Sequence, residues 1–270
     1  MKQDTLRVAS WNVNSIRARL PRLEDWLRER EPDVVCLQEL KGEAGVFPGE
    51  RLEQLGYRTA VFGQRTYNGV AVLSREEPRG AVRGLPGDGP DPQARLIEVD
   101  LGTMRVLSVY VPNGGEVGSE KYAFKLEWLS RLTRRLAELR ESGRSLLVCG
   151  DFNAAREERD VSDVDEWEGS VLYNPEMRAA MLRILDLGFV DLFRSREPAG
   201  GHFSWWDYRQ RSFARDRGLR IDYLLASAEL ADSCVSCWID RDQRGGEKPS
   251  DHAPVVAEIA LNGRGGEQSR

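Results

Sequence analysis

The chain has 270 residues, of which 40% are hydrophobic and 31% charged, a balance typical of a globular protein with one large domain or two small ones. A chain of this length can bury a sizeable core without disulfide bonds, and no apolar stretch approaches the roughly 20 residues that a membrane-spanning helix needs. The formal net charge of -5 argues against a protein that coats nucleic acid through general positive charge, although it leaves local basic patches open.

The N-terminal residues, "MKQDTLRVAS", lack the apolar segment of a secretory signal, so we expect a cytoplasmic protein without a membrane partner. The cysteines agree with this expectation. Cys36 and Cys149 lie inside apolar runs, where a thiol usually acts as a small buried hydrophobic group. Cys234 and Cys237 have C-x-x-C spacing but no second pair nearby, which favours buried strand residues over zinc ligands.

Strand-like segments recur along the whole chain, rich in β-branched and aromatic residues and bounded by turn-forming residues. In chain order they are residues 6–13, 33–39, 57–63, 69–74, 95–101, 104–111, 145–152, 202–208, 219–227, 234–240 and 254–261. Helical patterns lie between them at 22–30, 119–141 and 174–187, and the second has apolar residues near helical spacing with arginines and glutamates opposite. This mixture predicts an α/β fold (α+β by some schemes) of two packed sheets flanked by helices, with a large antiparallel share.

No linker, internal repeat or low-complexity segment divides the sequence. We therefore predict a single domain over residues 1–262, followed by a flexible C-terminal tail at 263–270 whose "GRGGEQSR" sequence is typical of a frayed end.

Several predicted strands end in polar residues suited to binding a metal ion or a phosphate. A single Asn or Asp after a strand usually forms a turn, and a glutamate there is usually a surface residue, so each case alone is weak. Together they predict a polar site at the strand ends. The residues in question are Asn12, Asn14, Glu39, Tyr110, Asn113, Asp151, Asn153, Asp222, Asp251 and His252.

These segments, in this order, resemble the exonuclease III family of AP endonucleases, which belongs to the wider endonuclease/exonuclease/phosphatase superfamily. The resemblance is carried by "SWNVNSIRARL", "PDVVCLQELK", "GVAVLS", "YVPNG", "LLVCGDFN", "HFSWWDYR", "GLRIDYLLAS" and "KPSDHAPV", which span nearly the whole chain. It implies a DNase I-like four-layer sandwich. It also implies a magnesium-dependent DNA repair nuclease that cleaves 5′ to abasic sites, removes nucleotides in the 3′-to-5′ direction and cleans blocked 3′ ends.

The chemistry of phosphodiester hydrolysis agrees with this implication. Magnesium prefers oxygen ligands and is usually held by one or two carboxylates plus a substrate phosphate. Only two histidines exist, so a multi-histidine metal site is excluded. By resemblance, the Mg²⁺ ligands are Glu39, Asn12 and Asp251, with Asp151 and Asn153 available to a second ion and Mn²⁺ as a substitute metal.

The resemblance also implies catalytic roles. Asp151 would activate or orient the attacking water, and Asn153 would hold either the phosphate or Asp151. Because side chains at i and i+2 of an extended segment share a face, both are expected to face one centre, with Phe152 in the core. His252 and Asp222 resemble the family's histidine–aspartate pair, in which the charged imidazole stabilises the pentavalent phosphate. The hydroxyl of Tyr110 is expected to contact the phosphate.

Arginines and aromatic residues crowd the segment around "WWDYR", which suits contact with a DNA backbone and insertion at a lesion. The expected partner is double-stranded DNA with abasic sites or 3′ ends, bound by a monomer. Trp206 is expected to form the pocket for an extruded abasic sugar. His202 has no evident partner, and a structural or surface role is favoured. The expected DNA-binding residues are Asn14, Arg17, Asn113, Lys121, Trp206, Arg209 and Arg217.

Departures from the family pattern affect substrate preference more than the nuclease assignment. Ser15 stands where many relatives have Gly, and residues 155–178 diverge most. Two alternatives remain open at this point. One is another superfamily phosphatase or phosphodiesterase that acts on lipids, inositol phosphates or RNA. The other is a catalytically inactive nucleic-acid-binding regulator on the same fold.

Overall fold

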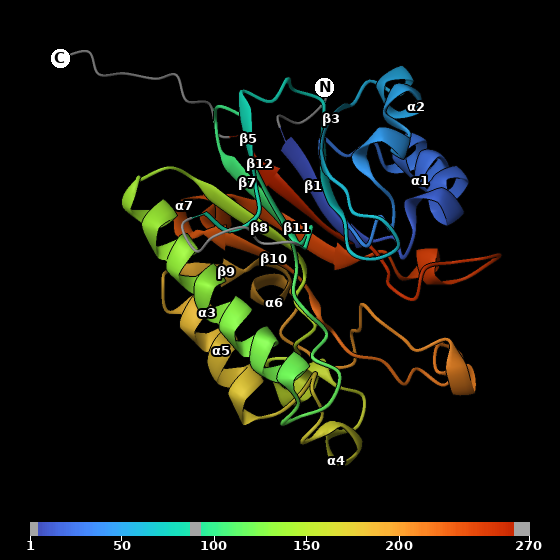
Figure 1. Ribbon diagram of the computed structural model, residues 1–270, viewed down its shortest axis with the longest axis vertical. Coiled ribbons are helices and arrows are strands. Elements are labelled where there is room, and N and C mark those ends of the chain that lie inside the picture. Colours follow the sequence, from blue (N-terminus) through green and yellow to red (C-terminus); the bar gives the residue numbers. More distant parts are fainter. Residues whose placement is uncertain (1–4, 87–92, 262–270) are drawn as a thin grey trace.

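Two six-stranded sheets lie face to face in the computed structural model, which describes residues 5–86 and 93–261 (Figure 1). The first sheet has the order β11 (Cys234–Ile239), β12 (Val255–Ala260), β1 (Thr5–Asn12), β2 (Val34–Gln38), β4 (Val70–Ser74) and β3 (Arg58–Phe62). The second has the order β5 (Gly80–Arg83), β6 (Leu96–Asp100), β7 (Arg105–Tyr110), β8 (Leu146–Asp151), β10 (Asp222–Ser227) and β9 (Phe189–Asp191). The predicted tail at 263–270 lies outside the described residues.

Helices cover the outer face of each sheet (Figure 1). On the first sheet lie α1 (Ile16–Arg30) and α2 (Gly49–Gln54); on the second lie α3 (Glu120–Glu141) and α5 (Pro175–Leu185). The predicted four-layer sandwich is therefore confirmed. The shorter helices are α4 (Val164–Trp167), α6 (Leu192–Arg196) and α7 (Ala228–Asp232), and 3-10 turns occupy Ala44–Val46, Glu158–Asp160, Arg209–Arg211 and Arg241–Arg244.

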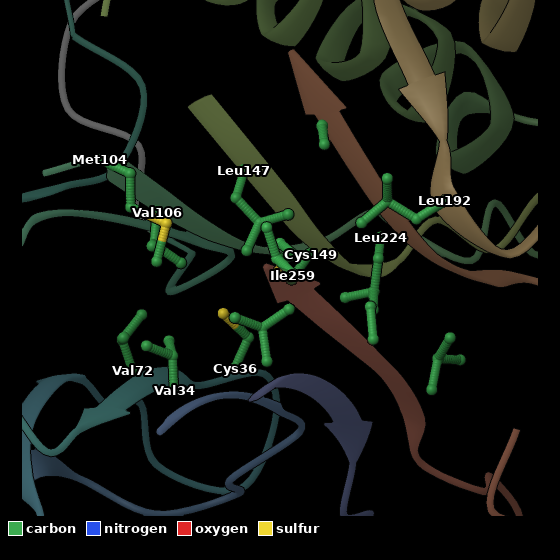
Figure 2. Close-up of a cluster of buried hydrophobic side chains, with 14 of the residues drawn as sticks. Val34, Cys36, Val72, Met104, Val106, Leu147, Cys149, Leu192, Leu224 and Ile259 are labelled. Atoms are coloured by element: carbon green, nitrogen blue, oxygen red, sulfur yellow. The ribbon is translucent and has the colours of Figure 1, made fainter. Parts of the chain in front are cut away.

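The central core lies between the two sheets. In Figure 2, Val34, Cys36 and Val72 of the first sheet face Val106 and Leu147 of the second, and all are buried. Such continuous apolar runs are typical of strands that are covered on both faces. All four cysteines are buried free thiols in this core, as the sequence predicted for C-x-x-C in a strand.

The topology brings the polar strand ends to one edge of the sandwich. β1 and β2 are parallel neighbours, and so are β7 and β8, because α1 and α3 carry the chain back between them. β12 runs antiparallel to β1 and β10 runs antiparallel to β8, so these two strands begin where their partners end. In the register of β8 and β10, Asp151 pairs with Asp222. Residues far apart in the sequence thus meet at one edge.

Two local predictions were wrong, and two strands were missed. Residues 202–208 form no strand: only Trp205 makes isolated bridges, because Phe203 and Trp206 pack inward in a small aromatic cluster. The short strands β5 and β9 were missed, since β5 is an exposed edge and β9 has three residues, too few for a pattern. The first helix begins at Ile16 rather than Arg22, with the Ser15 hydroxyl accepting a hydrogen bond from the Ala18 N–H as its cap.

Gly150, one residue before Asp151, allows β7 and β8 to approach closely. A Cβ at this position would lie 2.0 Å from the Val109 carbonyl oxygen, so the two strands must separate to accept a side chain. We expect Gly150→Ala to lower the free energy of unfolding by about 3 kcal/mol or more and to displace Asp151 from the end of β8. Urea denaturation measures the stability, and nuclear magnetic resonance of the Asp151 amide detects its displacement. Gly80→Ala in β5, where a Cβ meets nothing within 4 Å, is the matched control and should leave both unchanged.

Candidate active site

Three ionisable side chains converge at the edge of the sandwich. Glu39 follows β2, Asp151 ends β8 and His252 precedes β12; each offers one ligand atom, and these atoms lie within 4.8 Å of one another. The amide of Asn12, at the end of β1, joins the two carboxylates. Its Nδ2 donates to Glu39 Oε1 at 2.9 Å and to Asp151 Oδ2 at 2.8 Å. Four predicted site residues therefore share one centre.

His252 is bound by two buried carboxylates. Its Nδ1 lies 2.9 Å from Asp222 Oδ2, and its Nε2 lies 3.7 Å from Asp151 Oδ2. Ser204 fixes Asp222, because its hydroxyl donates to the same Oδ2 at 2.6 Å. Burial by itself lowers the pKa of His252, but Asp222 and then Asp151 outweigh it and raise that pKa to about 10. The imidazole is therefore positively charged at neutral pH, with Nε2 directed at Asp151.

Asp151 is almost completely buried, and its pKa lies above the ordinary value of an aspartate. Burial, with smaller contributions from Asp222 and Glu39, raises its pKa to about 7, although His252 acts in the opposite direction. The main-chain N–H of Asn153 donates to Asp151 Oδ1 at 2.9 Å. A carboxyl group with this pKa and fixed orientation can accept a proton near neutral pH.

Asn153 reaches the site differently from the prediction. Its φ of 48° is left-handed, so Asp151 and Asn153 do not share the face of an extended segment. The Asn153 Nδ2 donates to the Val111 carbonyl at 2.9 Å, and its Oδ1 accepts from Asn113 Nδ2 at 3.2 Å. Asn153 therefore holds Asp151 through its main chain, while its side chain secures the neighbouring loop. Phe152 is completely buried, as predicted.

Asp251 lies beside this centre with both carboxylate oxygens engaged. Asn14 Nδ2 donates to Oδ1 at 2.7 Å and Trp205 Nε1 donates to Oδ2 at 3.0 Å. Burial raises the pKa of Asp251, but the charge of His252 and these hydrogen bonds lower it by more. The pKa of Asp251 therefore lies below its ordinary value. Asp251 is thus an ionised anchor for Asn14 and Trp205.

Tyr110 ends β7 and remains a neutral phenol. Its ring lies under the Arg95 guanidinium, 4.9 Å from the ring centroid. Burial first, and then Glu39 and Asp151, raise its pKa well above the ordinary value. A phenol that keeps its proton can donate a hydrogen bond to an anionic oxygen.

The donor set fits a hard cation. Glu39 and Asp151 supply oxygens, and the repulsion between their charges contributes to the raised pKa of Asp151, which a cation would relieve. His252 does not suit a ligand role, because Asp222 occupies Nδ1 and the protonated ring has no free lone pair. Two of the expected metal ligands, Asn12 and Asp251, do not offer an oxygen to this centre in the same way. Asn12 presents N–H groups rather than its oxygen to the carboxylates, and Asp251 lies outside the cluster of three.

The predicted DNA-binding arginines and lysine lie on α1, on α3 and in the loop that follows Trp206. Arg17 is exposed in the first turn of α1, and Lys121 is exposed in the first turn of α3, next to the loop that carries Asn113. Arg209 pairs with Asp207 at 3.0 Å, and Arg217 pairs with Glu166. The last two arginines line a cavity of about 290 Å³ together with Trp167.

The prediction that Trp206 forms a pocket for an abasic sugar was wrong. The side chain of Trp206 is completely buried against Phe203, Phe213 and Ala253, and its Nε1 donates to Asp216 Oδ1 at 3.1 Å, so it anchors the loop from inside the protein. The neighbouring Trp205 faces the site instead. The sequence could not separate the two, because outside a regular strand the alternation of side chains does not hold.

Sequence reasoning missed three residues that contact the site. Lys41 pairs with Glu39 at 2.8 Å, and Ser204 and Trp205 bind the aspartates as described above. Lys41 lies in the same "QELK" motif as Glu39, which was an available signal. His202, in contrast, is exposed with Glu197 as its neighbour at 3.7 Å, in agreement with the predicted surface role.

Part of the backbone strain of the chain lies near this centre. Positive φ angles, which cost a residue other than glycine about 1–3 kcal/mol, occur at Asn14 (45°), Ser15 (91°), Glu39 (52°), Lys41 (53°) and Asn153 (48°). Ser15 adopts a conformation natural to glycine and compensates in part through its helix cap.

Comparisons with known proteins agree with this geometry. The family model described as the Endonuclease/Exonuclease/phosphatase family matches residues 9–252. Exodeoxyribonuclease III of Haemophilus influenzae is 39% identical over 266 residues, which cover 94% of this chain and 100% of that protein. An AP endonuclease structure from Archaeoglobus fulgidus has a TM-score of 0.92 at 39% identity, covering 95% of this chain and 100% of that one.

A third relative is the Neisseria 3′ phosphatase NExo, solved with a product DNA hairpin. Its TM-score is 0.92 at 37% identity, with 94% of this chain and 99% of that chain covered. The chain described here therefore belongs to the endonuclease/exonuclease/phosphatase family and, within it, to the exonuclease III group of DNA repair nucleases, which hydrolyse phosphodiester bonds.

Proposed function

We propose that this nuclease is a Mg²⁺-dependent enzyme that acts on double-stranded DNA at abasic sites and at 3′ ends. Its activities would be cleavage 5′ to an abasic site, 3′-to-5′ exonuclease action and removal of blocking 3′ groups. The observation that carries the proposal is the buried centre formed by Glu39, Asp151 and His252, with Asp222 behind the histidine. Mn²⁺ is the expected substitute metal.

Glu39 is the proposed principal metal ligand, with Asp151 near enough to share the ion. When bound, the ion would supply a Lewis acid for the phosphate oxygens. Asp151 accepts the proton of the attacking water, because its raised pKa makes it a base near neutral pH and Asn153 and Asn12 hold its two oxygens in place.

Two further groups stabilise the negative charge that develops on the phosphate. His252 stays protonated beside Asp222 and directs Nε2 toward the reacting centre, where a fixed positive charge is worth more than in water. Tyr110 offers its phenol hydroxyl for a hydrogen bond. Asn12 holds the carboxylates of Glu39 and Asp151 through its amide N–H groups. Asp251 holds Asn14 by accepting a hydrogen bond from its amide.

The DNA substrate would lie across the edge of the sandwich. Arg17, Lys121 and Arg209 are exposed on three separate elements around the site, which suits neutralisation of a phosphate backbone. Trp205 packs with Leu219 and Ile221 in an apolar cluster next to Asp251, and this cluster supports recognition of an extruded abasic sugar. The NExo structure with a DNA hairpin supports a DNA substrate by similarity.

We further propose that the enzyme is a cytoplasmic monomer. Within residues 5–86 and 93–261, none of the helices combines the length and apolar character that a membrane crossing requires.

A gel assay tests the proposal. An end-labelled duplex with one abasic analogue and an intact duplex are each incubated with Mg²⁺, with Mn²⁺ and with excess chelator. We expect incision 5′ to the analogue and shortening from 3′ ends with either metal, and neither reaction with chelator. Cleavage that persists in chelator would contradict the metal requirement, and equal incision of both duplexes would contradict abasic recognition. DNA binding without turnover would favour the inactive regulator, and turnover of inositol phosphates or RNA alone would favour the other superfamily activities.

A further inference from the structure

Lys125 is a buried lysine on the apolar face of α3. Its side chain has no exposure, and it lies in the same stripe as Tyr122, Trp128 and Leu132. Lysine is almost never completely buried unless its charge is satisfied. Burial lowers the pKa of its ammonium group to about 7, although Asp151 acts in the opposite direction, so an ammonium at this position needs compensating contacts.

Three main-chain carbonyls provide that compensation. Lys125 Nζ donates to the carbonyl oxygens of Asn113 at 3.0 Å, Asn153 at 2.7 Å and Val171 at 2.6 Å. An ammonium group has three N–H donors, so each donor has one carbonyl partner. A neutral amine has only two N–H donors, so the three carbonyl acceptors favour the charged ammonium group, against the effect of burial.

These carbonyls belong to three stretches of chain between regular elements. Asn113 lies between β7 and α3, Asn153 lies directly after β8, and Val171 lies between α4 and α5. Asn113 and Asn153 are also joined through their side chains at 3.2 Å. The Lys125 contact therefore fixes the loop that orients Asp151 relative to two neighbouring loops.

The packing around Lys125 leaves little freedom for these loops. A Cβ at Gly114 would lie 2.9 Å from Lys125 Cδ and 3.3 Å from Tyr122 Cδ2. Leu172, the residue after Val171 in the chain, packs with Leu219 and Ile221 in the cluster that includes Trp205. A shift at Lys125 would thus reach both Asp151 and the apolar cluster.

We propose that Lys125 is a positioning residue for catalysis: its ammonium group ties the main chain at Asn113, Asn153 and Val171 into one arrangement and so sets the place of Asp151. It does not touch the substrate, because it is completely enclosed by the protein. The inference rests on the proposed Mg²⁺-dependent cleavage of DNA.

The test compares Lys125→Met with Leu132→Ala in steady-state cleavage of the abasic duplex, corrected for the folded fraction. Leu132 is a buried apolar residue seven positions further along the same helix, and its side chain cannot hydrogen-bond to the three carbonyls, so it controls for loss of stability alone. We expect Lys125→Met to lower kcat by about 10- to 100-fold, as for a small misplacement of a catalytic group, with little change in KM. Leu132→Ala should keep the wild-type kcat per folded molecule.

A double-mutant cycle separates positioning from stability. If Lys125 acts by placing Asp151, Lys125→Met should lower kcat much less in the Asp151→Asn background than in the wild-type enzyme. An equal fold-loss in both backgrounds, a wild-type kcat in Lys125→Met, or an equal loss in Leu132→Ala would each overturn the inference.

If Lys125→Met does not fold, Lys125→Gln takes its place, because its amide keeps two N–H donors for the three carbonyls. A wild-type kcat in Lys125→Gln would also overturn the inference. Failure of the wild-type enzyme to cleave with Mg²⁺ would instead contradict the proposed function.

Discussion

Replacing Asp151 by Asn should lower kcat for cleavage of the abasic duplex by about 10²- to 10⁴-fold, the range of a lost general base. The amide has the same size as the carboxyl group, and its oxygen can still accept from the Asn153 N–H, so the loop stays in place. It cannot accept a proton from water, and it removes the negative charge that faces His252 and Glu39. The loss should therefore fall on kcat and leave the fold unchanged.

Single-turnover kinetics with saturating Mg²⁺ measures this effect, and thermal melting checks the fold. Asp186→Asn is the matched control: it makes the same charge change at an exposed position that caps the end of α5. It should retain the wild-type rate. A wild-type rate in Asp151→Asn would remove Asp151 from the mechanism and, with it, the assignment of this centre as the active site.

Replacing His252 by Ala should lower kcat by about 10²- to 10³-fold, because a preorganised charge at the developing negative charge of the phosphate is lost. His252 lies between Asp222 and Asp151 and contacts both carboxylates. Alanine at this position leaves the two carboxylates without that shared positive charge. The rate is measured at pH 7.5 with the abasic duplex. A wild-type rate in this variant would exclude the imidazolium from catalysis.

Asp222→Asn tests the same pair through its pH dependence. In the wild-type enzyme, the pKa of about 10 for His252 keeps the cation present through the neutral range, so the alkaline loss of activity should come near pH 10. Asp222 is the largest contribution that raises this pKa, so its removal should move the alkaline limb of the pH–rate profile down by about 1–3 pH units. An unmoved limb would show that another group titrates there.

The stability change has a defined sign. The folded pKa of His252 lies above its unfolded value of 6.5, so the folded state binds the proton more tightly. The stabilisation by the His252–Asp222 pair is therefore fully present below pH 6.5 and is lost as the pH rises through about 10. Urea denaturation at pH 6 and at pH 10 should show a larger difference between wild type and Asp222→Asn at the lower pH.

Much of the candidate site was predictable from local sequence. Strands such as residues 33–39 and 145–152 were evident from their apolar runs, and the polar residues that follow them predicted a site at the strand ends. The structure brings Glu39, Asp151, Asp222 and His252 together as that hypothesis required. The division into two sheets with helices outside also followed from the pattern of elements.

Irregular segments could not be predicted from the sequence, because they lack the regular spacing of apolar residues that marks helices and strands. The aromatic run at 202–208 has the composition of a strand, yet it folds as an irregular loop in which Trp206 is buried and Trp205 faces Asp251. The left-handed conformation of Asn153 likewise broke the expected alternation after β8. Which side chain of a neighbouring pair turns inward depends on the packing of distant residues, here Phe213 and Ala253.

The sequence by itself determined the chemistry of this protein: an acidic, histidine-poor set of strand-end residues that resembles one nuclease family. Only the tertiary structure decided how those residues are held. The pKa of Asp151 depends on its burial beside Asp222 and Glu39, and the role of Lys125 depends on carbonyls 12, 28 and 46 residues away. Hydrogen-bond partners and desolvation arise from the close packing of distant segments, and the order of residues along the chain does not encode them in any local pattern.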